Sequence, residues 1–86
     1  MTDMKTRPRF ELFHRLADGP SARIRKRVDA LGLLEHSEFR NVHFESHAQA
    51  LASHGTAEVP SIWDGERLHA GEEAANAFLS SYGAAS

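Results

Sequence analysis

Asp18 and Ser21 are the polar side chains whose spacing first suggests chemistry, because they flank Gly19-Pro20 where a helix is expected to begin. Pro20 suits a first helical turn, since its missing N–H is not needed there. Either polar side chain can cap the helix by accepting a hydrogen bond from a free N–H of that turn. The same N–H groups and the helix dipole also favour an anion. Capping and anion binding therefore both remain open for this loop.

A run of basic residues follows the loop. Arg23, Arg25, Lys26 and Arg27 occupy most of the expected helix surface that is not apolar. Guanidinium groups bind carboxylates and phosphates well. The run is therefore typical of a site for an anionic ligand or an acidic partner, or simply of a solvated helix face. Charge is also divided unevenly along the sequence: residues 1–30 carry a net charge of +4 and residues 31–86 a net charge of −6.

The chain has no cysteine, which excludes disulfides, thiolate nucleophiles, iron–sulfur clusters and cysteine zinc sites. Histidines stand at positions 14, 36, 43, 47, 54 and 69. His47 and His54 share a helical face but lie two turns apart, roughly 10 Å, which is too far for one metal ion. His43 and His47 have the spacing of helical zinc pairs, but an expected strand end intervenes. We expect no metal site.

Length and composition limit the remaining classes. Eighty-six residues are enough for one compact domain, so we expect a single domain over 1–86 with a core at about 9–82. The chain is 41% hydrophobic and 26% charged, as globular proteins are. A net charge of −2 argues against nucleic-acid binding, and no apolar run could cross a membrane. Without an export signal, a cytoplasmic location is the default expectation.

The pattern of apolar residues and breakers predicts seven elements. Strands are expected at 9–14, 38–44, 59–63 and 66–69, and helices at 22–31, 46–52 and from 71–73 to 83. Ser46 is the expected cap of the second helix, Asp64-Gly65 a two-residue hairpin turn, and Gly83 the end of the last helix. The order β-α-β-α-β-β-α predicts an α/β fold, with a mixed four-stranded sheet and helices on both faces.

Two segments carry a resemblance to known proteins. One is Glu58-Val59-Pro60 followed by Asp64-Gly65 and an amphipathic helix, and the other runs from Leu12 to Gly32. Over residues 9–82 the chain resembles the glutaredoxin branch of the thioredoxin-like superfamily, and also the N-terminal domain of glutathione transferases. The resemblance implies a thioredoxin-like three-layer fold with a cis peptide bond before Pro60.

The resemblance also implies which residues would meet glutathione. The family's Cys-x-x-Cys pair falls on Asp18 and Ser21, or on Gly19 and Ala22 if the alignment shifts by one. Without sulfur, thiol–disulfide exchange is impossible. Ser21 matches a transferase serine that stabilises the thiolate of glutathione.

Three further positions match the family's glutathione contacts. Arg15 matches a residue that meets the glycine carboxylate, and the Val59 backbone matches the group that pairs with the cysteinyl unit. Glu72 and Glu73 stand where small residues usually hold the γ-glutamyl carboxylate, and their charge weakens such a site.

We therefore expect a redox-inactive, glutaredoxin-like binding module with no catalytic residue. A groove beside Pro60 would bind an extended peptide or a small anionic ligand, with Val59 offering main-chain hydrogen bonds and Arg15 and Arg23 anion contacts. No cofactor is required, although glutathione is an alternative ligand, with transferase-like activity at Ser21. A structural role, such as dimerisation through an exposed sheet edge, is a further alternative.

Overall fold

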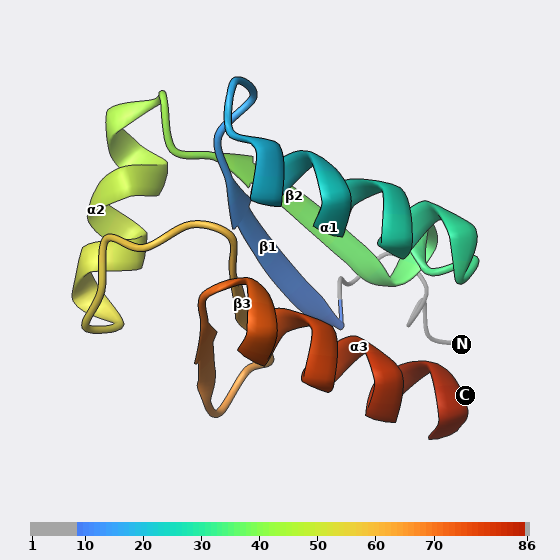
Figure 1. Cartoon of the computed structure of the whole chain (residues 1–86). Coiled ribbons are helices and arrows are strands. Elements are labelled where there is room, and N and C mark those ends of the chain that lie inside the picture. Colours follow the sequence, from blue (N-terminus) through green and yellow to red (C-terminus); the bar gives the residue numbers. More distant parts are fainter. Residues whose placement is uncertain (1–8, 86) are drawn as a thin grey trace, which may run out of the picture.

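The computed structural model describes residues 9–85, with side chains described through Gly83. Its elements run in the order β1 (Phe10–His14), α1 (Gly19–Ala30), a short 3-10 helix η2 (Leu34–His36), β2 (Ser37–Asn41), α2 (Glu45–Ser53), β3 (Ser61–Trp63), β4 (Leu68–Ala70) and α3 (Glu72–Ala85) (Figure 1). The four strands form one sheet in the order β2-β1-β3-β4. β1 pairs with β2 in parallel, and the other two pairings are antiparallel. The predicted α/β class and mixed sheet are confirmed.

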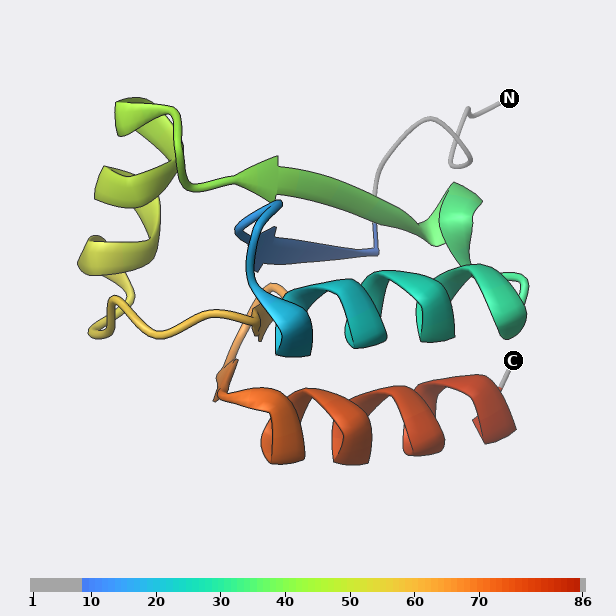
Figure 2. The same cartoon turned by 45° about the horizontal axis from the view of Figure 1, so that its top comes forward.

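Helices α1 and α3 lie side by side on one face of the sheet (Figures 1 and 2). The residues buried there come from both helices, from β1 and β3 and from the turn after α1: Phe10, Leu12, Ile24, Val28, Leu33, Ile62, Ala75 and Leu79. The ring of Phe10 meets the rings of Phe78 and Tyr82 edge-on, with centroids 5.3 and 5.2 Å apart. This layer is the larger of the two cores.

Helix α2 packs against the opposite face, near the ends of β1 and β2. Side chains alternate along β1, so Phe13 points away from the α1 layer and packs with Val42 and Leu51. Farther along the same face, Arg40 forms ion pairs with Glu11 at 3.1 Å and Glu38 at 3.4 Å. Helices therefore lie on both sides of the sheet, but the nine-residue α2 covers only part of its side.

The chain turns after β2 earlier than the sequence indicated. β2 ends at Asn41, whose side-chain oxygen accepts a hydrogen bond from the His43 N–H at 2.9 Å while its carbonyl oxygen accepts one from the Phe44 N–H at 3.1 Å. These local bonds replace strand pairing. The expected cap was also wrong: α2 begins at Glu45 after Phe44, which makes no side-chain capping bond, and Ser46 lies inside the helix.

The β3–β4 hairpin has a four-residue loop in place of the expected two-residue turn. Trp63 pairs with Leu68, so the return strand begins two residues later than predicted. The reason is Asp64, whose Oδ1 accepts hydrogen bonds from the N–H groups of Glu66 and Arg67, both at 2.8 Å. Its Oδ2 meets His69 Nε2 at 2.9 Å.

The last helix runs past its expected end. Gly83 lies within α3 beside the side chain of Leu31. A glycine in a helix costs about 1 kcal/mol relative to alanine, which the packing of the apolar face of α3 outweighs. No helix among residues 9–85 is long and apolar enough to cross a bilayer.

The packing of β1 generates a stability prediction. Leu12 is fully buried between the sheet and the α1 layer, whereas Leu16 is 65% exposed. We expect Leu12→Ala to lower the free energy of unfolding by about 2–5 kcal/mol, because it leaves a cavity. The matched variant Leu16→Ala should change it by less than about 0.5 kcal/mol. Urea unfolding measures both, and equal losses would contradict this assignment of the core.

Candidate functional site

The loop between β1 and α1 is closed by its own hydrogen bonds. Asp18 is the helix cap: its Oδ2 accepts a hydrogen bond from the Ser21 N–H at 2.9 Å. The Ser21 hydroxyl oxygen in turn accepts one from the Arg15 N–H at 3.2 Å, and Ser21 is completely buried. Both side chains therefore form hydrogen bonds within the loop. The hydroxyl of Ser21 faces no solvent, so in this conformation it offers no atom to a bound thiolate.

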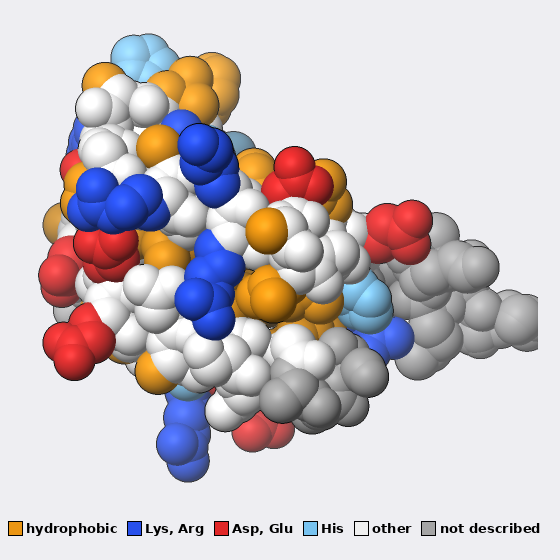
Figure 3. Space-filling model, turned by 45° about the vertical axis from the view of Figure 1, so that its right-hand side comes forward, with side chains coloured by type: hydrophobic (Ala, Val, Ile, Leu, Met, Phe, Trp, Pro, Cys, Tyr) orange, Lys and Arg blue, Asp and Glu red, His pale blue; other side chains and the backbone are white. Residues whose placement is uncertain are grey.

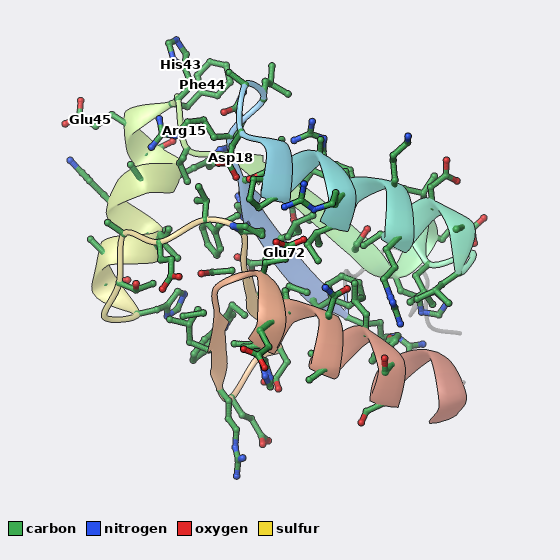
Figure 4. All side chains as sticks on the ribbon, in the orientation of Figure 1. Arg15, Asp18, His43, Phe44, Glu45 and Glu72 are labelled. Atoms are coloured by element: carbon green, nitrogen blue, oxygen red, sulfur yellow. The ribbon has the colours of Figure 1, made fainter. Side chains whose placement is uncertain are left out.

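Arg15 is the exposed cation of this loop. Its carbonyl oxygen accepts a hydrogen bond from Arg25 Nη1 at 3.3 Å, while its own guanidinium has no protein partner within residues 9–85. In Figure 4, Arg15 and Asp18 lie close together in the loop, and Glu72 lies nearby at the start of α3. Arg15 is therefore a cation free to meet an external anion.

The backbone at Val59 lies just before β3, which begins at Ser61, two residues later than the predicted strand start. The Val59–Pro60 peptide bond is cis, Pro60 is buried and Val59 is half-buried against the Phe13 cluster. β3 pairs with β1 from Ser61 opposite Phe13 onward. Extending this register would place Val59 opposite Arg15, but β1 ends at His14. Among the described residues, the N–H and C=O groups of Val59 consequently have no hydrogen-bond partner.

At the start of α3, the residues expected to bind a ligand bind one another. Arg23 Nε lies 2.7 Å from Glu72 Oε2 and Arg23 Nη2 lies 3.0 Å from Oε1, a two-pronged ion pair that joins α1 to α3. The hydrogen bond from Arg23 lowers the pKa of Glu72, and the same bond raises the pKa of Arg23. The expected role of Arg23 as a free anion contact is therefore not seen. Glu73 lies exposed beside the pair.

A second carboxylate lies over the same helix start. A Cβ atom at Gly71 would lie only 2.8 Å from Glu58 Oε2, so the Glu58 side chain rests against this glycine. Gly71 has a φ of +92°, a conformation that favours glycine. Its N–H donates to the Pro60 carbonyl oxygen at 2.9 Å. With Glu58 and Glu72 both present, this end of α3 is acidic and unfavourable for a ligand carboxylate.

Most of the basic run on α1 is engaged within the protein. Besides Arg23, Arg25 bonds to His14 and Arg27 Nη2 donates to Ser80 Oγ at 2.8 Å. Figure 3 shows Lys and Arg side chains on the face that these helices form. Lys26 is exposed and makes no ion pair within the described part of the chain. Most side chains of this run therefore bond α1 to neighbouring elements and are not free to bind a ligand.

His14, at the end of β1, is 4% exposed. Its Nδ1 lies 3.1 Å from Arg25 Nη1, and because a guanidinium can only donate, Nδ1 is the acceptor and the ring is neutral. Burial lowers the pKa of His14, and the charges of Arg25 and His47 lower it further. A neutral buried histidine is a structural element here, as the sequence allowed.

An open hollow of about 460 Å³ lies between α1 and β2, lined by Ala22, Arg25, Lys26, Asp29, Leu34 and Phe39.

A second hollow, of about 380 Å³, opens beside Arg15 and was not predicted. It is lined by Arg15, Leu16, Ala17, Asn41 and His43, which lie at or just after the carboxyl ends of the two parallel strands. Ligands of open α/β sheets bind at such ends. Leu16, in the lining, is 65% exposed. Phe44 is 57% exposed and lies beside His43 at this end of the molecule (Figure 4). An apolar residue inside a turn-rich loop, as at Leu16, was the available sequence signal.

The histidines do not gather into a metal centre. Within residues 9–85, no three His, Asp or Glu side chains lie close enough together to hold a metal ion. His54 instead stacks on Trp63, with ring centroids 3.9 Å apart. His69 contacts Asp64. Each of these rings has a packing or hydrogen-bonding role.

Comparison with known proteins gives no assignment: no family model, curated protein or solved structure matches the chain.

The environment of His14 makes stability depend on pH. A group whose pKa is lowered by folding contributes stability that is complete above its unfolded value, about 6.5, and is lost as the pH falls toward the folded value. We expect wild type to lose more stability than His14→Asn, which keeps an acceptor but does not titrate, between about pH 7 and about pH 5. Urea unfolding at a series of pH values measures this, and parallel curves would contradict it.

Proposed function

We propose that this protein is a redox-inactive module of the glutaredoxin type, with a thioredoxin-like fold, which binds an extended peptide along the free backbone of Val59. Val59 packs against the Phe13 cluster, and Pro60 next to it is buried. Asp18 and Ser21, where one of the two alignments places the family's cysteines, are engaged in the hydrogen bonds of the loop between β1 and α1. Binding, not electron transfer, is the activity that these side chains leave possible.

The observation that carries the proposal is the unpaired main chain at Val59. A peptide laid antiparallel to the chain at Val59 would occupy the place where β1 would have continued beyond His14. Its backbone would supply the N–H and C=O partners that Val59 lacks, which is the mode of strand addition. Arg15 would meet an acidic side chain or the carboxyl terminus of the peptide, and the hollow beside Leu16 would accept an apolar one.

An extended peptide fits this site better than glutathione does. The γ-glutamyl carboxylate would meet Glu58 and Glu72 at the start of α3, and Arg23, the nearest cation, is already paired. The buried hydroxyl of Ser21 does not reach a thiolate. A main-chain ligand depends on none of these groups.

The role of Arg15 is tested with peptides selected from a random phage-displayed library on the immobilised protein. We expect selected peptides to contain Asp or Glu, and Arg15→Ala to weaken their binding about tenfold, the loss of one charge-assisted contact worth about 1.4 kcal/mol. Arg67→Ala, which removes an exposed arginine from the distant hairpin, should bind normally. Failure to enrich any peptide, or equal binding by both variants, would contradict the proposal.

A pair of substitutions at Val59 separates main-chain binding from packing. Val59→Pro removes the N–H group, whereas Val59→Ala keeps it and only shortens a half-buried side chain. We expect Val59→Pro to abolish binding of the selected peptides in a fluorescence anisotropy titration, and Val59→Ala to retain most of it. Circular dichroism checks that both variants fold. Unchanged binding by a folded Val59→Pro variant would move the site elsewhere.

A further inference from the structure

The free edge of β2 presents a row of backbone groups to solvent. β2 is the outermost strand on its side of the sheet (Figure 2). The carbonyl of His36 and the N–H of Val42 bond to the β1 side, at Arg9 and His14. Because the direction of these groups alternates along a strand, even-numbered residues of β2 face β1. The backbone groups of Ser37, Phe39 and Asn41 therefore point outward.

Two of these outward groups are already satisfied within the chain. The Ser37 N–H donates to the Leu34 carbonyl oxygen. The Asn41 carbonyl oxygen accepts from the Phe44 N–H at 3.1 Å and lies 3.1 Å from His47 Nδ1. Four outward groups are then left without a partner among residues 9–85: the N–H and C=O of Phe39, the C=O of Ser37 and the N–H of Asn41.

We propose that this edge pairs with the same edge of a second copy of the chain, antiparallel and centred on Phe39. In that register each Phe39 exchanges two hydrogen bonds with Phe39 of the second copy. Each Asn41 N–H donates to the Ser37 carbonyl oxygen of the other copy. The four free groups of each chain are all used.

The two groups that already have partners within the chain also lie opposite each other in this register. The Ser37 N–H of one copy would face the Asn41 carbonyl of the other, and neither needs a new partner. An arbitrary peptide added at this edge would instead present a free carbonyl to Ser37 and a free N–H to Asn41. The pattern of the edge is thus self-complementary, as a two-fold interface requires.

Side-chain charges support the same partner. Glu38 and Arg40 flank Phe39, so the proposed register places Glu38 opposite Arg40 of the second copy, and Arg40 opposite Glu38. These are the non-hydrogen-bonded pairs, in which side chains approach most closely. Phe39, 36% exposed, would meet its counterpart at the axis. A five-residue edge forms a small interface, so we expect a weak, reversible dimer.

Charge reversal tests the register. Glu38→Arg places like charges opposite each other in a pair of identical copies, and so does Arg40→Glu, so each variant alone should sediment as a monomer. Mixing the two variants should restore the dimer, because both positions then carry arginine in one chain and glutamate in the other. Wild type should show a rising sedimentation coefficient from micromolar to millimolar concentration. Glu66→Arg, the same charge change on the distant hairpin, should dimerise as wild type does.

A second readout does not require Arg40→Glu to fold, which matters because Arg40 also pairs with Glu11. In wild type, the amide resonances of Phe39 and Asn41 should shift with protein concentration and that of Ser37 should change least. A strict monomer at millimolar concentration would overturn the proposal. So would shifts confined to other elements, or a Glu38→Arg variant that dimerises as wild type does.

Discussion

The hydrogen bond from the Arg15 N–H to the Ser21 hydroxyl is the constraint on which the arrangement of this protein depends. It closes the loop between β1 and α1, and the bond from the Ser21 N–H to Asp18 starts the helix at a fixed point. The start of α1 sets where Ile24 and Val28 meet the sheet, and where the helix delivers the chain to β2. The loop also holds Arg15 at the surface, directly after the end of β1. The hydrogen bond between Arg15 and Ser21 therefore helps to position both the core and the proposed binding site.

The partners of the basic side chains on α1 also follow from where this helix lies. α1 lies against α3 and across the end of β1, so its arginines find partners in Glu72, Ser80 and His14. These bonds satisfy most of the basic run inside the molecule. The Arg15 backbone carbonyl accepts a hydrogen bond from Arg25, but the Arg15 guanidinium has no partner within residues 9–85. This contrast makes Arg15 the cation of the proposed site, while Arg23, Arg25 and Arg27 hold α1 in place.

The order and class of the elements could be predicted because they depend on local patterns. The apolar alternation of β1, the Asp18 cap with Pro20 behind it, and the apolar face of α3 each appear within a few residues. The β2–α2 turn and the hairpin loop could not be predicted, because single side chains, Asn41 and Asp64, bond to nearby backbone and override the usual capping and turn preferences. For the site, the sequence indicated Arg15, Val59 and Pro60. It could not indicate that Arg23 and Glu72, 49 residues apart, would neutralise each other, since that depends on the packing of α1 against α3.

The most direct test of the account follows the Val59 amide itself. Nitrogen-15-labelled protein would be titrated with a selected peptide while hydrogen exchange is measured residue by residue. Formation of a main-chain hydrogen bond predicts that the Val59 amide shifts with saturation and that its exchange slows, with smaller shifts at Arg15 and Leu16. A Val59 amide that exchanges as fast in the presence of saturating peptide as in its absence would contradict the account.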